Sequence, residues 1–138
     1  MPYKSVTQEN GLGCGLACVS ALCKVSYKFA KKNYFLGLGN ANTKGYYCKH
    51  IVKALSRAGK NYNYCKITRR INWKDGMIVF IKRSKRYTQG HYLVRLNNMW
   101  MDPWINLQTD QNIRNAKSGF RKRLPGKAQW LIYEDHNL

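Results

Sequence analysis

The chain has 138 residues and is 44% hydrophobic, which is enough for one domain to bury a core of ordinary size. Its 25 lysines and arginines exceed its 6 acidic residues and give a formal net charge of +19, more than folding requires. The charge predicts an acidic partner, and RNA, an acidic inhibitor or immunity protein, an anionic membrane surface or an acidic peptide substrate would each satisfy it. The sequence lacks the run of roughly 20 apolar residues that crosses a bilayer, and residues 1–5 lack the apolar core of a signal peptide.

The five cysteines do not resemble a disulfide framework, because their number is odd and three of them fall within ten residues. We therefore expect a reducing compartment such as the cytoplasm, reached if necessary by delivery into a target cell. The spacing of Cys14, Cys18 and Cys23 does not match the Cys-x2-Cys pairs of structural zinc, so neither a metal nor another cofactor is expected. Apart from Cys14, the cysteines, which include Cys48 and Cys65, are expected to be small buried hydrophobes.

The first half of the chain reads as helices. Residues 14–23 follow a Gly-Leu-Gly break and are apolar nearly all round, which predicts a buried helix. Residues 28–38 predict a second, short helix that ends at a glycine-rich segment. Residues 47–58 place apolar side chains at helical spacing, and Gly59 suits the C-terminal cap of this third helix.

The second half reads as strands, because short runs rich in β-branched and aromatic residues replace the helical spacing. The predicted strands are residues 62–67, 77–81, 91–96, 99–103 and 129–134. Helices followed by an antiparallel sheet indicate an α+β fold, and we expect one domain over residues 1–138. Two strongly basic stretches, residues 82–90 and 117–127, are expected to face solvent.

Cys14 is the cysteine whose position favours chemistry. It begins the first predicted helix, where unpaired backbone N–H groups and the helix dipole favour a thiolate. Gly13 and Gly15 would allow a tight turn and the close approach of a substrate carbonyl. A buried helix that merely starts with small residues is the alternative at this point.

A β-hairpin is predicted around Asn97-Asn98, because asparagine tolerates the positive φ of a tight type I′ turn. A two-residue loop there determines which residues of the two strands are opposite each other. The expected pairs are Leu96 with Met99, Arg95 with Trp100, Val94 with Met101 and Leu93 with Asp102.

This register places His91 and Asp102 on the same face of the sheet, as diagonal neighbours within reach of each other. A carboxylate beside an imidazole keeps it in one tautomer and stabilises the imidazolium, as a base for a cysteine thiol requires. Cys14 would complete such a nucleophilic set. The alternative is a solvent-facing histidine and an aspartate that forms an Asx turn before Pro103.

Three motifs resemble those of one enzyme family. Residues 8–18, Gln-Glu-Asn-Gly-Leu-Gly-Cys-Gly-Leu-Ala-Cys, resemble the nucleophile segment of the bacteriocin-processing cysteine peptidase domains fused to transporters that export double-glycine-leader peptides. Residues 90–94, Gly-His-Tyr-Leu-Val, and Asp102-Pro103 resemble the family's second and third motifs, in the same order. The region between them, residues 45–67, is also similar. The resemblance spans residues 8–104 and implies a papain-like cysteine peptidase fold.

The resemblance also implies roles for individual residues. Cys14 would be the nucleophile, His91 the general base and acid, and Asp102 the orienting carboxylate. Gln8 would donate its side-chain amide to the oxyanion, an interaction worth roughly 3–4 kcal/mol in a dry site.

The sequence departs from that family in two respects. The family's peptidase domain precedes a transmembrane transporter, so we expect this chain to act without coupling to export. A peptidase that cuts a Gly-Gly leader also has no need of a charge of +19, and residues 106–138 match no motif.

Three functions therefore stay open. The first is a cysteine peptidase, as a delivered antibacterial toxin or effector domain. The second is a ribonuclease toxin on the same scaffold, with His91 as base and Tyr87 and Phe120 stacking on RNA bases. The third is a nucleic-acid-binding module without catalysis. The candidate basic substrate contacts are Lys82, Arg83, Lys85, Arg86, Arg121, Lys122 and Arg123.

Overall fold

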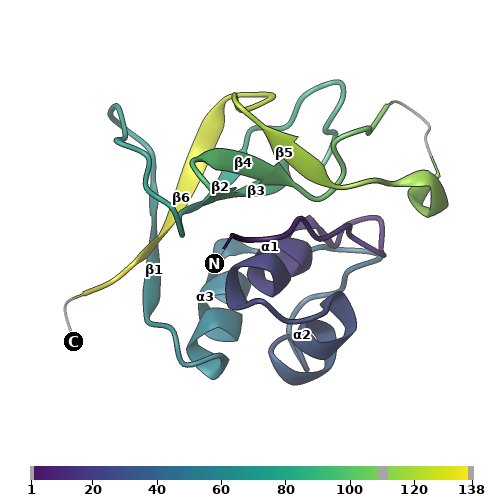
Figure 1. Cartoon of the computed structure of the whole chain (residues 1–138), viewed down its shortest axis with the longest axis horizontal. Helices are drawn as coiled ribbons and strands as arrows, with labels where there is room; N and C mark the ends of the chain where they lie inside the picture. Colours follow the sequence, from purple (N-terminus) through teal and green to yellow (C-terminus); the bar gives the residue numbers. More distant parts are fainter. Residues whose placement is uncertain (1, 109–111, 137–138) are drawn as a thin grey trace.

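The computed structural model describes residues 2–108 and 112–136, and these form two layers (Figure 1). Three helices make one layer: α1 (Cys14–Cys23), α2 (Tyr27–Asn33) and α3 (Cys48–Arg57). Six strands make the other: β1 (Tyr62–Lys66), β2 (Ile78–Ile81), β3 (His91–Leu96), β4 (Met99–Asp102), β5 (Gly119–Arg121) and β6 (Ala128–Glu134). A short 3-10 helix, Ile113–Asn115, precedes β5. The predicted α+β class is confirmed.

The strands form one antiparallel sheet with the order β1-β6-β2-β3-β4-β5. The last strand of the chain, β6, therefore lies inside the sheet, between β1 and β2. Strand β5 forms one edge, next to β4. None of the helices in the described part of the chain is long and apolar enough to cross a membrane.

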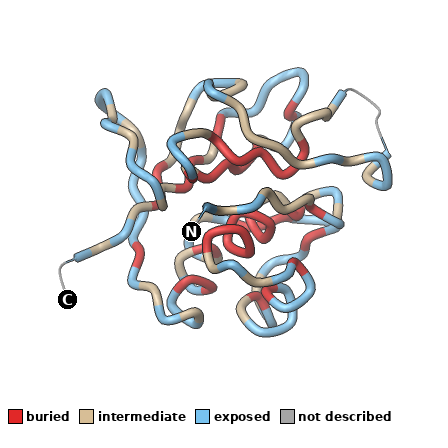
Figure 2. Tube along the Cα trace, viewed as in Figure 1, coloured by how far each residue is buried: buried red, intermediate tan, exposed pale blue. Residues whose placement is uncertain are grey.

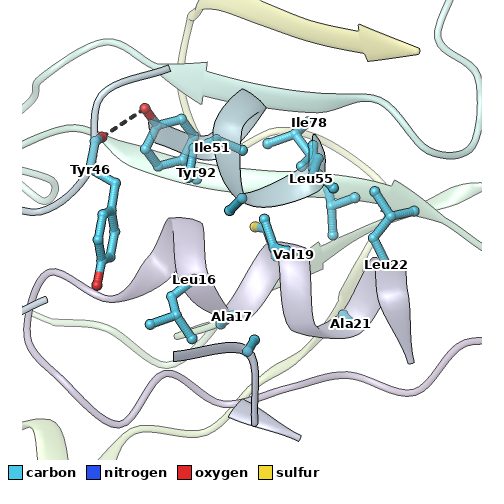
Figure 3. Packing of buried hydrophobic residues seen from close by; sticks show 14 of the residues in the cluster. Leu16, Ala17, Val19, Ala21, Leu22, Tyr46, Ile51, Leu55, Ile78 and Tyr92 are labelled. Atoms are coloured by element: carbon cyan, nitrogen blue, oxygen red, sulfur yellow. Dashed lines mark hydrogen bonds between the residues drawn. The ribbon is translucent and has the colours of Figure 1, made fainter. Parts of the chain in front are cut away.

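Helix α1 packs against β3 and β4 of the sheet and also against α2 and α3, which explains why its sequence is apolar nearly all round. Leu16 and Val19 are completely buried, and buried segments concentrate where α1 faces the sheet (Figure 2). On the β3 side, Tyr92 packs into the same core. Its hydroxyl donates a hydrogen bond to the backbone carbonyl of Tyr46 at 2.8 Å, which ties the start of α3 to the sheet (Figure 3).

The β3–β4 hairpin has the predicted turn and register. Asn97 and Asn98 have φ angles of 55° and 58°, which a type I′ turn requires. Three of the predicted cross-strand pairs are present: Val94 with Met101, Arg95 with Trp100 and Leu96 with Met99.

Three local predictions were wrong. Helix α2 ends at Asn33 instead of residue 38, because the Arg57 guanidinium binds the carbonyls of Tyr34 and Leu36 and holds the following segment as a turn. Residues 119–121, within a stretch expected to be solvated, form β5. Cys65 is exposed on the edge strand β1 and is not a core residue, whereas Cys18 is completely buried.

Candidate active site

The packing of α1 against β3 determines where the thiol of Cys14 lies. A Cβ on Gly15 would come within 2.6 Å of Ile51 Cδ1 and 3.1 Å of Tyr92 Cδ2, so a glycine is needed for this close approach. Cys14 itself is the first residue of α1 and is half-buried. The backbone N–H of Tyr92 donates a hydrogen bond to its sulfur, with N and Sγ 3.4 Å apart. The thiol therefore lies at the beginning of β3.

His91, the first residue of β3, lies between the thiol and a carboxylate. Its Nε2 is 2.7 Å from Oδ1 of Asp102, and its side chain is close enough to Cys14 for that thiol to raise the pKa of the imidazole. Because Nε2 is used by Asp102, the nitrogen that faces Cys14 is Nδ1. The imidazole is 3% exposed and stacks on the ring of Tyr87, with centroids 4.6 Å apart and an interplanar angle of 15°. The ring is thus held in one orientation.

Asp102, the last residue of β4, is fully buried and has three hydrogen-bond partners. Its Oδ1 accepts from His91 and, at 3.0 Å, from the backbone N–H of Trp104. Its Oδ2 accepts from Nη1 of Arg121 at 2.9 Å. The two sequence alternatives for this residue, an Asx turn and a pair with His91, are therefore both present.

The pKa shifts of His91 and Asp102 favour the charged form of each side chain. Burial alone would lower the pKa of His91, but hydrogen bonds to Asp102 and Cys14, and their charges, raise it to about 9. Burial would raise the pKa of Asp102, but the hydrogen bond and charge of His91, the Trp104 N–H and the charge of Arg121 lower it. The structure therefore favours an imidazolium beside a carboxylate at neutral pH.

Gln8 lies beside this site, but its amide is used elsewhere. The side chain is 2% exposed, and its Nε2 donates to the carbonyls of Asn10 at 3.0 Å and Gly11 at 3.2 Å. Its Oε1 is buried and has no hydrogen-bond partner among the described residues. Because both amide hydrogens are used, an oxyanion contact would require Gln8 to release one of these carbonyls. The predicted role of Gln8 stays a prediction.

Two of the seven basic residues predicted to contact substrate donate side-chain hydrogen bonds to other groups of the protein. Arg121 holds Asp102, as described above. Arg86 donates to the carbonyls of Leu107 at 2.8 Å and Ile105 at 3.2 Å, and its guanidinium lies 5.3 Å from the ring centroid of Tyr87. For Arg121, which is only partly exposed, the expectation of a solvated basic stretch was wrong, because it lies against a buried carboxylate that the sequence does not reveal. Arg86 is exposed, as expected, although its guanidinium is held by two backbone carbonyls.

The other five, whose role in substrate binding stays a prediction, are exposed: Lys82, Arg83, Lys85, Lys122 and Arg123. Sequence reasoning also missed how Trp104 and Tyr87 contribute. Tyr87 was expected to stack on a base, but it is 2% exposed and covers the ring of His91. No signal in the sequence distinguished it from a surface aromatic, because its neighbours along the chain are basic and polar.

Two cavities meet at Cys14. The larger one, about 670 Å³, extends between residues 43–49 and the sheet. The smaller one, about 270 Å³, lies on the His91 side and is bordered by Gln8, Tyr87 and Trp104. Among the described residues, no group of three or more His, Cys, Asp or Glu side chains is placed to hold a metal ion. An extended chain that follows both cavities would pass the sulfur.

The sequence matches no protein-family model and no curated protein. Two solved structures resemble the fold over nearly its whole length. One is the peptidase domain of Streptococcus ComA, a bifunctional ABC transporter involved in a quorum-sensing pathway. It is 19% identical with a TM-score of 0.56, over 95% of this chain and 96% of that one. The other is the peptidase domain of ComA from Streptococcus mutans, 19% identical with a TM-score of 0.50, over 95% and 98% of the two chains. The chain therefore has the papain-like fold of the ComA peptidase domains.

Proposed function

We propose that the protein is a cysteine peptidase in which Cys14 is the nucleophile, His91 the general base and acid, and Asp102 the orienting carboxylate. The observation that carries the proposal is that Cys14 and His91 border the same cavity, while His91 Nε2 is hydrogen-bonded to the buried Asp102 at 2.7 Å. The fold shared with the ComA peptidase domains also supports it.

In the resting site of the proposed reaction, His91 Nδ1 already carries the proton given up by the Cys14 thiol, because the raised pKa of the imidazole favours its charged form. The thiolate attacks the carbonyl carbon of the scissile peptide bond and forms a tetrahedral intermediate. His91 then gives its proton to the leaving nitrogen as the C–N bond breaks, and a thioester remains on Cys14. Throughout, Asp102 keeps Nε2 hydrogen-bonded, which leaves Nδ1 directed at the reacting atoms.

In the second half, water attacks the thioester while His91 Nδ1 takes one of its protons. The C–S bond breaks, the proton stays on His91, the carboxylic acid product leaves, and the sulfur and the imidazolium return to their starting state. The backbone N–H groups in the first turn of α1 have no intrahelical acceptors, and Cys14 contributes the first of them. We assign the Cys14 N–H to the oxyanion in both halves.

A cleavage map tests this proposal. The purified protein is incubated with a library of proteome-derived peptides, and new peptide ends are identified by mass spectrometry. We expect cleavage by the native protein and by the Cys65→Ala variant, which lacks an exposed thiol outside the site. We expect none by Cys14→Ala. Cleavage that survives in Cys14→Ala, or no cleavage by the native protein, would contradict a thiol peptidase.

The ribonuclease alternative loses the two aromatic side chains on which it relied. Tyr87 is buried against His91, and Phe120 is half-buried and packs against the main core. Tyr87 therefore offers no free ring face to an RNA base, and Phe120 is only partly accessible. Peptide hydrolysis is therefore the function that the geometry supports better.

As part of the same proposal, the enzyme acts in the cytoplasm of a target cell as a delivered toxin. The net charge of +19 supports this, because it suits neutralisation by an acidic immunity protein. Cytoplasmic expression of the native chain in bacteria should then arrest growth, and Cys14→Ala should not. Equal growth of the two strains would contradict the toxin role and leave the peptidase proposal to the cleavage map.

A further inference from the structure

A row of aromatic side chains crosses the sheet and ends at the catalytic sulfur. Trp130 on β6 is paired with Phe80 on β2, and Phe80 is paired with Tyr92 on β3, whose N–H binds Cys14 Sγ. Tyr64 on β1 extends the row, with its ring centroid 6.3 Å from that of Trp130. These rings line the larger cavity beside Cys14. We call this cavity the aromatic groove.

The wall opposite the sheet is formed by residues 43–49, where the chain leads into α3. Tyr47 on this wall is 66% exposed, which is unusual for a large aromatic ring. Two exposed lysines, Lys44 and Lys49, accompany it, and Arg83 reaches the groove from the end of β2. The ammonium of Lys49 lies 5.9 Å from the centroid of the Tyr47 ring. The rim of the groove is therefore cationic.

These cations have no counter-charge nearby. The described residues that line the aromatic groove and the smaller cavity include no aspartate or glutamate. None of the ion pairs among the described residues involves Lys44, Lys49 or Arg83. Like charges with no local partner repel one another, so an anionic occupant would relieve that repulsion. A groove with an apolar floor and a cationic rim favours a ligand with apolar and acidic groups close together.

We propose that the aromatic groove binds an extended peptide segment next to the scissile bond, with an apolar side chain on the floor and acidic side chains at the rim. The inference rests on the proposed peptidase function and specifies its substrate class. It gives a function to part of the positive charge that folding does not require. Because the groove ends at Cys14, the bound segment continues directly into the bond that is cut.

The geometry of the rings favours a peptide over a single-stranded nucleic acid in this groove. The Phe80 and Tyr92 rings are tilted by 59°, and the Tyr64 and Trp130 rings by 58°. Successive bases stack on ring faces that are open and nearly parallel to them. Rings that pack against one another at these angles form a continuous apolar floor instead, which suits an aliphatic or aromatic side chain.

The test starts from the cleavage map. We expect aspartate and glutamate to be enriched close to the cut on one side. A cleaved peptide is then compared with the same peptide in which each glutamate is changed to glutamine, and kcat/KM should fall several-fold. With Lys49→Glu, kcat/KM for the acidic peptide should fall about fivefold, the effect of one exposed charge, and kcat/KM for the glutamine peptide should fall much less.

The variants are matched so that a folding defect cannot explain the result. Lys49 is in the first turn of α3, where a glutamate interacts favourably with the helix dipole. Lys49→Glu should therefore fold at least as well as the native chain. Lys32→Glu makes the same charge change on an exposed residue of α2, which does not border the aromatic groove, and should leave both kcat/KM values unchanged.

The outcomes separate the two proposals. If no peptide is cleaved, the peptidase function is overturned and this inference with it. If peptides are cleaved but the glutamate and glutamine forms react equally, only the inference is overturned. Total RNA incubated with the same proteins is the third arm, and RNA cleavage that is lost in Lys49→Glu would assign the aromatic groove to a nucleic acid and overturn the inference.

Discussion

Arg121 holds the oxygen of Asp102 that His91 leaves free, so two cationic side chains share one buried carboxylate. The guanidinium comes from the edge strand β5, which pairs with β4 and places Arg121 next to the end of that strand. It adds positive charge beside a carboxylate with no exposed surface. We therefore regard Arg121 as a positioning residue for His91, acting through Asp102.

Arg121→Gln should shift the acidic limb of the activity profile to higher pH. Arg121 lowers the pKa of Asp102, so its loss lets the carboxyl protonate at higher pH. Stability that this carboxylate contributes is present above its unfolded pKa and is lost on acidification, and the loss should start earlier in the variant. The free energy of unfolding at neutral pH should fall by about 2 kcal/mol, because one partner of a buried charge is removed from a site that is a quarter exposed.

Activity across pH and urea unfolding measure these two effects. Arg121→Lys keeps the charge, so its acidic limb and its free energy of unfolding should both lie closer to those of the native protein than in Arg121→Gln. Lys127→Gln removes a charge from an exposed residue and is the matched control. An acidic limb that does not move in Arg121→Gln would show that the guanidinium does not act on Asp102.

The local part of the site was predictable from the sequence, because it depends on turn chemistry and strand alternation. Asn97-Asn98 determines the hairpin register, and this register brings His91 to Asp102. Cys14 was identified by its place at the start of an apolar helix. Each of these inferences needed only residues close together in the sequence, or motifs in a known order.

The partners of this local site were not predictable, because they come from distant segments. Strand β5 has three residues and no alternation, so only its pairing with β4 identifies it. Arg121 lies in a charge run that resembles a solvated surface, and only the folded chain places it on Asp102. Likewise, Tyr87 looks like an exposed loop aromatic until it is found stacked on His91.

The pKa of His91 predicts a stability change on the alkaline side of neutrality. Its folded value of about 9 lies above the ordinary value of 6.5, so the imidazolium stabilises the fold fully below about pH 6.5 and loses that effect as pH rises through about 9. Relative to His91→Gln, the native protein should lose on the order of 3 kcal/mol across this window. Urea unfolding of both proteins at several pH values measures the difference between their free energies of unfolding. The contributions of titratable groups that the two proteins share cancel in this difference. A difference independent of pH would contradict the raised pKa.

Gly90→Ala should destabilise the protein more than Gly59→Ala does. Both glycines have positive φ, 76° and 81°, so an alanine is strained at either position, by about 1–2 kcal/mol. A Cβ at Gly59 meets no atom within 4 Å, whereas one at Gly90 would lie 2.1 Å from the Phe80 ring and push it aside. We expect a further loss of about 1–3 kcal/mol from this overpacking.

Gly90 immediately precedes His91, so Gly90→Ala should also lower activity, and Gly59→Ala should not. Urea unfolding and peptide cleavage by the two variants measure these effects. Equal losses of stability would mean that Phe80 moves away without cost.

Cys14 should react with iodoacetamide at pH 6 faster than Cys65, although Cys65 is the more exposed thiol. The reason is that the imidazolium of His91 lies beside Cys14, whereas Cys65 is paired with the apolar Leu131 of β6. In His91→Gln, labelling of Cys14 should slow by about tenfold or more, while that of Cys65 serves as the internal reference. Peptide mapping after brief labelling gives both rates in one sample. Equal slowing of the two thiols would point to a global change of the protein rather than to a thiolate–imidazolium pair.

The position of β6 inside the sheet has a consequence for how the protein is made. Strands β1 and β2 do not pair with each other; each pairs with β6, which leaves the ribosome after both of them. The sheet cannot close until translation has passed residue 134, and the cation on β5 also arrives late in synthesis. A nascent chain that already carries Cys14, His91 and Asp102 therefore remains without a finished site. The order of synthesis thus delays a reactive thiol until the whole fold is present.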